Sequence, residues 1–315
     1  MNTTANTPKG RRSPFKRFLY YMRENYQLYT LLLPALVFII IFAYVPMYGA
    51  QIAFRDYKIT DGIWGSEWVG LKHFIRFVTG INFWQLLWNT VGLSLYTLFA
   101  GAPFPILLAI MLNEVSNVHF KKTIQMITYA PYFISTVAVC GLLLLFLQRE
   151  TGLINLLRIA LGSEGYDFMS DPKWFRTIYV LSHIWQYSGW GTIIYIAALT
   201  GVDVQIVEAA RIDGANRFQK IWYIDLPSIL PTIVILLVLD AGSLMNVGYE
   251  KILLMQNSLN METSEVISTY VYRLGIVDAQ FSYTTAIGLF NSVVNIILLV
   301  IVNKFADKFT QTSLW

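Results

Sequence analysis

Six long apolar stretches constrain the fold of this chain more than any other feature of its sequence. A helix needs about 20 apolar residues to cross the ~30 Å hydrocarbon core of a bilayer, because hydrocarbon offers no partner to an unpaired backbone amide or carbonyl. The stretches of that length are residues 28–50, 86–112, 124–147, 177–202, 228–249 and 284–303. They predict an all-α polytopic membrane protein with six transmembrane helices.

Ionisable side chains lie almost entirely between these stretches. Charged residues make up 13% of the chain, about half of the ~25% found in ordinary globular domains. Inside the stretches, Asp240 and His183 are the only Asp, Glu, Lys, Arg or His residues, and Cys140 is the single cysteine. These are too few for a catalytic centre or a metal site. We therefore expect no enzyme and no resident metal or cofactor, and the scattered net charge of +4 does not indicate nucleic acid binding.

The Lys and Arg residues predict the side of the membrane on which each connection lies, because cytoplasmic loops carry an excess of both. An even number of spans puts both termini on one side. Residues 1–27, 113–123, 203–227 and 304–315 hold 13 Lys and Arg in 75 positions, against 10 in 97 for the other three connections. We expect 1–27 and 304–315 to be cytoplasmic tails that flank a six-span domain over 28–303, in contact with membrane lipid.

The longest inner connection, residues 203–227, is too apolar and too rich in helix-forming residues for a simple tether. Asp203 is placed to cap a short helix, Gly214 to allow a bend after it, and Pro227 to start the next span. We expect a short helix, a bend and a second short helix along the membrane surface.

The side chains of this loop suit insertion into a cleft on another protein. They include small residues for close approach, apolar anchors and a charge pair for register: Ala209, Ala210, Ala215, Ile212, Phe218, Glu208 and Arg211. A rigid helix held in such a cleft would transmit the partner's movement to the spans at either end. From these residues alone, an amphipathic helix that rests on lipid is an equally good interpretation.

Residues 208–227 also resemble the EAA loop of ABC importer permeases. The match comprises Glu208-Ala209-Ala210, three residues, Gly214, nine residues and then Ile224-x-Leu226-Pro227. The resemblance implies a type I ABC importer permease fold whose coupling helix contacts a separate ATPase. It assigns this ATPase-coupling role to Glu208, Ala209, Ala210, Arg211, Asp213 and Gly214.

A similarity to the carbohydrate-uptake branch of this family extends over most of the chain beyond residue 28. It includes Asn89-Thr90, residues 152–155, Gly189-Trp190 and residues 269–273, and it looks most like permeases for oligosaccharides released from plant or algal polysaccharides. The partners that it implies, in a bacterial cell membrane, are a second homologous permease, two ATPase subunits, an extracellular solute-binding protein and an oligosaccharide substrate. The chain has no GxxxxGK[ST] phosphate loop, so ATP and Mg²⁺ would be bound by the partner ATPase.

Polar and aromatic residues within the spans are candidates for the substrate pathway. Aromatic rings bind the C–H faces of sugars, and amides and carboxylates bind their hydroxyls. The candidates are Trp185, Tyr187, Trp190, Asp240, Asn246, Tyr249, Asn291 and Asn295. Helix packing and anchoring at the membrane interface are the alternative roles for the Trp and Tyr residues. We expect His183 to be a hydrogen-bonded structural residue.

Asp240 lies near the middle of its span, where an ionised side chain is costly unless it faces protein, water or a partner charge. It therefore indicates a functional cavity, although a hydrogen bond that ties two helices together is an equally good explanation. It also leaves a second mechanism open. An ion-coupled secondary transporter could use Asp240 as its coupling carboxylate, and uptake would then depend on a proton or sodium gradient rather than on ATP.

Overall fold

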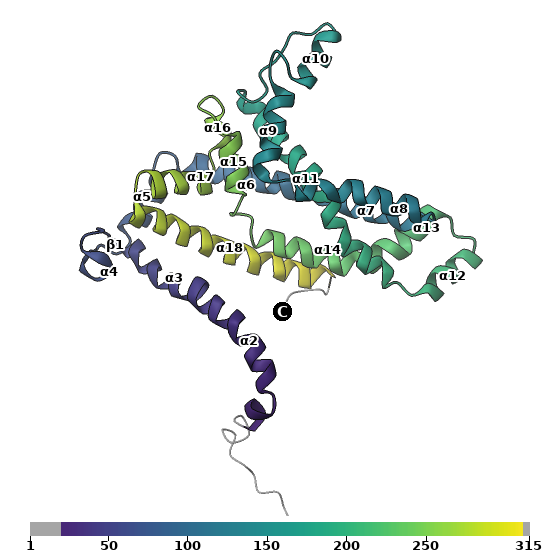
Figure 1. Ribbon diagram of the computed structural model, residues 1–315, viewed down its shortest axis with the longest axis horizontal. Helices are drawn as coiled ribbons and strands as arrows, with labels where there is room; N and C mark the ends of the chain where they lie inside the picture. Colours follow the sequence, from purple (N-terminus) through teal and green to yellow (C-terminus); the bar gives the residue numbers. More distant parts are fainter. Residues whose placement is uncertain (1–19, 311–315) are drawn as a thin grey trace, which may run out of the picture.

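The computed structural model describes residues 20–310, and most of that range is helical (Figure 1). The only strands in this range are β1 (Arg55–Asp56) and β2 (Glu67–Trp68), which pair antiparallel. The body consists of long helices that run side by side: α6 (Phe83–Gly101), α7 (Pro103–Glu114), α8 (Val118–Tyr129), α11 (Pro172–Thr200), α14 (Leu226–Ala241) and α18 (Phe281–Thr310). The predicted all-α class is confirmed.

Shorter elements complete the fold. The first span joins α2 (Tyr26–Ile39), a π-helical turn (Ile40–Tyr44), α3 (Val45–Met47) and a 3-10 helix (Tyr48–Phe54). The connections between the long helices contain α4 (Gly62–Gly65), α5 (Lys72–Val78), α10 (Leu153–Ala160), α12 (Val204–Ile212), α13 (Arg217–Lys220), α15 (Tyr249–Met255), α16 (Met261–Ser264) and α17 (Ile267–Tyr272). Helix α9 (Thr136–Leu147) leaves the body at a steep angle and leads to α10 (Figure 1).

Six segments of the described chain can cross a membrane by length and composition, if bent pairs are counted. Four are unbroken: Tyr26–Phe54, Phe83–Glu114, Arg217–Ala241 and Phe281–Lys308. The other two are Val118–Phe133 with Thr136–Leu147, bent by 97°, and Pro172–Thr200 with Val204–Ile212, bent by 75°. These segments follow the order of the six predicted stretches.

The stretch 124–147, predicted as one continuous helix, is instead broken at Ile134. Pro131 lies in a 3-10 turn (Ala130–Phe133), and the Ser135 hydroxyl caps α9 by accepting a hydrogen bond from the Ala138 amide at 3.3 Å. The Gln186 side chain on α11 donates to the Ile134 carbonyl at 3.1 Å. A break at membrane depth requires such partners, since lipid offers none.

The stretch 228–249 was also predicted as one helix, but α14 ends at Ala241 and residues 242–248 form a turn. Two asparagines on α18 bind the exposed backbone of this turn. The Met245 amide donates to Asn295 Oδ1 at 3.0 Å, and Asn291 Nδ2 donates to the Met245 carbonyl at 3.2 Å. Because these side chains replace the missing helical hydrogen bonds, the helix can end here without leaving these backbone groups unpaired.

Three buried clusters hold the long helices together, and α11 contributes to two of them. One joins α6, α9, α11 and α15 around Phe175, and another joins α7, α11 and α14 around Ile229. The third joins α5, α6 and α18 around Ile287. Within a bilayer, close packing rather than transfer from water stabilises such contacts. The position of α11 is therefore central to the geometry of the whole subunit.

Helix α11 lies very close to α8 at Gly189. A Cβ atom placed there would lie 1.9 Å from the carbonyl oxygen and 2.4 Å from the carbonyl carbon of Thr128. Small residues allow this kind of approach between membrane helices. Any larger residue at this position must separate the two helices.

Candidate functional site

The loop between α11 and α14 forms the short helix, bend and second short helix that its sequence predicts. Helix α12 starts after Asp203, whose Oδ1 accepts a hydrogen bond from the Gln205 amide at 2.9 Å. This bond satisfies one of the four amides that every helix leaves unpaired at its start. The predicted capping role of Asp203 is confirmed.

Gly214 ends α12 in a left-handed conformation, with φ of +79°. The Ala215 amide donates to the Ala210 carbonyl at 2.9 Å, and the Gly214 amide donates to the Arg211 carbonyl at 3.1 Å. Together these two bonds form a Schellman motif, in which the residue at the position of Gly214 must adopt positive φ. The predicted bend therefore depends on a conformation that glycine enters without strain.

Helix α13 is fixed by a reciprocal capping box. The Gln219 amide donates to Asn216 Oδ1 at 2.9 Å, and the Asn216 amide donates to Gln219 Oε1 at 2.8 Å. Ile212 and Phe218, one on each side of the bend, are 86% and 83% exposed. Both side chains are therefore free to contact another protein or lipid, as the two interpretations of this loop require.

Lys220 ties the end of this loop to the long helix α7. Its ammonium pairs with the Glu114 carboxylate at the end of α7 and with Asp225 at 3.2 Å. All three side chains are largely buried, so removing one partner would leave an uncompensated charge. Sequence reasoning missed this network, because Glu114 and Lys220 are far apart in the chain.

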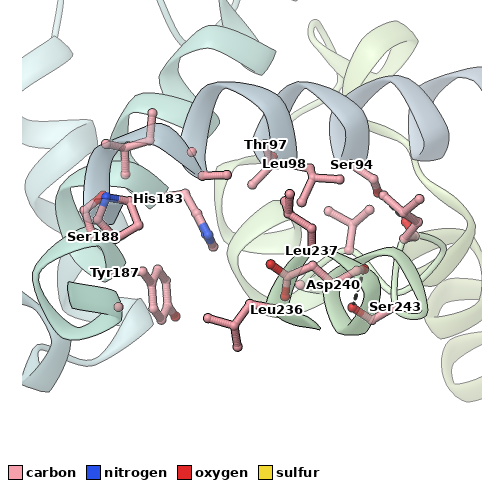
Figure 2. Close-up of a pocket in the computed structure, with 18 of the residues that line it drawn as sticks. Ser94, Thr97, Leu98, His183, Tyr187, Ser188, Leu236, Leu237, Asp240 and Ser243 are labelled. Carbon is pink, nitrogen blue, oxygen red and sulfur yellow. Dashed lines mark hydrogen bonds between the residues drawn. The ribbon is translucent and has the colours of Figure 1, made fainter. Parts of the chain in front are cut away.

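A cavity of about 390 Å³ lies between α6, α11, α14 and the turn at 242–248. Its volume falls within the range of small-molecule sites. Figure 2 shows the His183 and Tyr187 side chains on α11 and the Asp240 side chain on α14 pointing into the same space. Hydroxyl groups of Ser94 and Ser243 add further polar atoms to the wall.

An aromatic stripe forms the α11 side of the cavity. Tyr179, His183 and Tyr187 follow one another at spacings of four residues, which places them on one face of a helix. Their ring centroids lie 6.3 Å apart for Tyr179 and His183, and 4.5 Å apart for His183 and Tyr187. Such a stripe offers successive flat surfaces to a ligand that passes along it.

Three of the eight predicted pathway residues line this cavity: Tyr187, Asp240 and Asn246. The Trp190 ring instead stacks on Tyr132, with centroids 4.4 Å apart and planes 5° apart. Trp185 is exposed on α11 outside the cavity wall. Trp190 therefore has the helix-packing role that was the alternative interpretation, and Trp185 lies outside this cavity.

The other three predicted pathway residues lie outside this cavity. Tyr249 lines a second, more open cavity between α17 and α18, as does Asn291. Asn291 also donates to Asn246 Oδ1 at 3.0 Å, and Asn295 accepts from the turn after α14. In this conformation both amides support the turn that carries Asn246. Asn246 lies beyond the end of α14, so the turn rather than a helical face brings it to the same cavity as Asp240.

Sequence reasoning assigned His183 a structural role, but its ring lies on the cavity wall. Tyr179, also missed, lies one turn before it. The spacing of 179, 183 and 187 was a signal that could have identified both residues. Within residues 20–310, no group of three or more His, Cys, Asp or Glu side chains is arranged to hold a metal ion.

The 203–227 loop and most of the residues that line the cavity lie in a part of the chain that matches a known family. The family model described as "Binding-protein-dependent transport system inner membrane component" matches residues 101–311. The chain is 45% identical over 300 residues to the polygalacturonan/rhamnogalacturonan transport system permease protein YteP of Bacillus subtilis (strain 168), covering 95% of this chain and 94% of that protein. Protein LplB of the same strain is 44% identical over 93% of this chain and 92% of its own length.

Solved structures share the fold. One chain in the crystal structure of a bacterial ABC transporter involved in the import of the acidic polysaccharide alginate has a TM-score of 0.86 at 39% identity, covering 93% of this chain and 99% of that one. A chain in the bacterial alginate ABC transporter in complex with alginate pentasaccharide-bound periplasmic protein has a TM-score of 0.87 at 38% identity, covering 95% and 100%.

The family model covers about two thirds of the chain, and the relatives match over almost their whole length. The resemblance in the EAA loop and the predicted permease fold are thereby confirmed. The protein performs no covalent chemistry, and the ATPase is a separate component. This chain belongs to the family of inner membrane components of binding-protein-dependent transport systems, and it is a permease subunit of an ABC importer.

Proposed function

We propose that this permease translocates oligosaccharides released from plant or algal polysaccharides, after an extracellular solute-binding protein delivers them. The observation that carries the proposal is the 45% identity to a polygalacturonan/rhamnogalacturonan permease over 95% of the chain. The alginate transporter, solved with a pentasaccharide-bound periplasmic protein, supports delivery of an oligosaccharide rather than a monosaccharide.

The cavity has the chemistry that a sugar requires. Tyr179 and Tyr187 on α11 can cover the C–H faces of sugar rings, and Asp240 and Asn246 can accept hydrogen bonds from hydroxyls. A site built to hydrogen-bond each hydroxyl rejects ligands that lack it, because its buried polar groups would then be unpaired. These four residues are our candidates for direct substrate contact.

A second, homologous permease subunit completes the passage in this proposal. No residue of α2 is buried within the described chain, and its side chains are predominantly apolar along its whole length. Figure 1 shows α2 inclined away from the other long helices. A lone cavity of about 390 Å³ is also small for an oligosaccharide. Both observations favour a partner that packs against this subunit and encloses the pathway with it.

The 203–227 loop contacts the ATPase in this proposal, through Glu208, Arg211 and Asp213, with Ala209 and Ala210 permitting close approach. ATP and Mg²⁺ bind to two ATPase subunits, not to this chain. When ATP brings those subunits together, α12 and α13 follow as a rigid unit because both are capped. The Lys220 contacts with Glu114 and Asp225 pass the displacement to α7 and α14.

The test of this function is uptake by proteoliposomes that contain both permeases, the ATPases and the solute-binding protein. We expect uptake of plant or algal oligosaccharides to require ATP and to persist when ionophores collapse proton and sodium gradients. Uptake that follows an imposed ion gradient without ATP would instead support the ion-coupled mechanism through Asp240. Uptake of monosaccharides alone would contradict the proposed substrate class.

Membrane orientation gives a prediction that can be measured in intact cells. Cysteines at the exposed positions Ser163 and Ser258 should react with an impermeant thiol reagent, and a cysteine at exposed Ser116 should react only after lysis. The native Cys140 is buried and provides little background. Ser66 is unsuitable as an outer probe because it is 4% exposed. Labelling of position 116 in intact cells would reverse the proposed orientation and place both termini outside.

The cavity wall gives a prediction about transport. Asp240→Ala should lower uptake about tenfold or more, the scale of a lost hydrogen bond to a charged group. Leu239→Ala is the matched control, because Leu239 is the neighbouring exposed residue and does not line the cavity. Recovery of the ATPase with each variant reports on assembly. Uptake at the parental rate by the Asp240 variant would remove this cavity from the pathway.

A further inference from the structure

A buried lysine lies behind the aromatic wall of the cavity. Lys251 on α15 is 5% exposed. Its ammonium lies 3.5 Å from Gln186 Oε1, at the long limit of a hydrogen bond, and 5.5 Å from the centroid of the Tyr179 ring. None of the ion pairs within the described residues includes Lys251.

The depth of this charge makes it costly. Gln186 lies at the midpoint of α11 (Pro172–Thr200), so the ammonium beside it is close to the middle of the membrane. A cation at this depth is expensive unless it faces water or a partner charge, and such residues usually serve a function. One neutral amide and one aromatic ring do not compensate it fully.

The charge of Lys251 acts on the cavity through the α11 stripe. Tyr179, whose ring it faces, lines the cavity next to His183, with their ring centroids 6.3 Å apart. The carboxylate of Asp240 lies on another wall, contributed by α14 (Figure 2). A positive charge therefore lies behind the α11 wall of the cavity, which Lys251 itself does not line, and the α14 wall accepts hydrogen bonds.

This polarity matches one class of sugar. In a 1,4-linked uronate chain, the carboxylate at C5 lies on one edge of each ring, and the O2 and O3 hydroxyls lie on the opposite edge. A ring that passes between the two walls can turn its carboxylate toward Lys251 and its hydroxyls toward Asp240. A neutral hexose would make the second contact but would leave the charge of Lys251 uncompensated.

We propose that Lys251 selects for 1,4-linked uronate oligosaccharides by stabilising their carboxylates against the Tyr179–His183 wall, opposite Asp240. The inference rests on the proposed function, oligosaccharide import, and names the substrate class of the same cavity. Lys251 is a specificity-determining residue in this account, and its effect should depend on the charge of the substrate.

The test compares two substrates that differ only in charge. The complete complex with its binding protein is assayed for uptake of a 1,4-linked trigalacturonate and of the carboxyl-reduced trimer, in which CH₂OH replaces each carboxylate. Lys251→Met should lower the ratio of acidic to neutral uptake about tenfold, as expected for the lost attraction of a charge behind the cavity wall. Because each variant uses the same binding protein, a change in this ratio belongs to the permease.

Lys173→Met provides a matched control, since it removes an exposed lysine near the start of α11 and should leave the ratio unchanged. Lys251→Gln replaces the methionine variant if that one does not assemble. An unchanged ratio, whether uptake of both trimers falls equally or not at all, would overturn the inference and leave the proposed function intact. If the parental complex imports neither trimer, both the inference and its oligosaccharide premise fail.

Discussion

Gly189→Ala is expected to prevent the permease from assembling into a stable complex. The added methyl group would lie 1.9 Å from the backbone oxygen of Thr128, so α11 and α8 would have to separate. A backbone atom cannot move aside as a flexible side chain can. We expect the free energy of unfolding to fall by roughly 3 kcal/mol or more, which is the upper end of the cost of overpacking. Thermal unfolding of the purified permease in detergent measures the change.

Gly141→Ala is the matched control for this prediction. Gly141 also lies within a helix, α9, but no described heavy atom lies within 4 Å of a Cβ placed there. Its replacement should be neutral or slightly stabilising, because alanine has the higher helix propensity. Equal stability of the two variants would contradict the close contact between α8 and α11.

Gly214→Val is expected to reduce ATP-driven uptake about tenfold or more while the six spans still fold. A β-branched residue in the left-handed conformation costs about 1–2 kcal/mol, so the Schellman bend after α12 would open and displace α13. Gly214 is exposed, and its Cβ position meets no described atom within 4 Å. Conformation rather than space is therefore the cause of the expected loss.

Gly214→Asn separates the effect of conformation from the effect of any added side chain. Asparagine occupies the left-handed position of helix ends more readily than other non-glycine residues. We expect this variant to retain uptake within about threefold of the parental rate, which corresponds to a strain of roughly 0.6 kcal/mol. If Val and Asn reduced uptake equally, the bend would not be the feature that matters.

Local rules predicted those parts of the fold whose partners are near in sequence. The spans follow from apolar length, and the short helix and bend at 203–214 follow from Asp203, Gly214 and the residues between them. Every hydrogen bond of the Gly214 bend joins residues within five positions of each other. Such features can be predicted from one segment alone, and the structure confirms them.

The two interrupted spans could not be predicted in the same way, because their partners are distant. The Ile134 carbonyl is satisfied by Gln186, 52 residues away, and the Met245 amide by Asn295, 50 residues away. Apolar composition continues through both breaks, so hydropathy predicts unbroken helices. Only tertiary contacts make these breaks tolerable in a membrane.

Prediction of the cavity was partial for a related reason. Tyr187 was identified because aromatic rings bind sugars, and Asp240 because an ionisable residue within a span is unusual. Lys251 lies in a connection by sequence, where a lysine is ordinary, and only the return of α15 against α11 brings its charge to membrane depth. Asn291 and Asn295 resembled pathway residues, but their amides bind the turn that follows α14.

Co-purification of the ATPase tests most directly whether residues 203–227 couple this permease to ATP hydrolysis. Glu208→Ala should weaken ATPase docking by about 1–3 kcal/mol if the carboxylate makes a charge-assisted hydrogen bond there, and it should reduce stimulation of hydrolysis by the sugar-loaded binding protein. Glu164→Ala, at an exposed acid outside the loop, is the control. A helix that merely rests on an anionic leaflet would associate equally or more tightly after losing an acid. Unchanged ATPase recovery and unchanged stimulation with Glu208→Ala would contradict the coupling role of this loop.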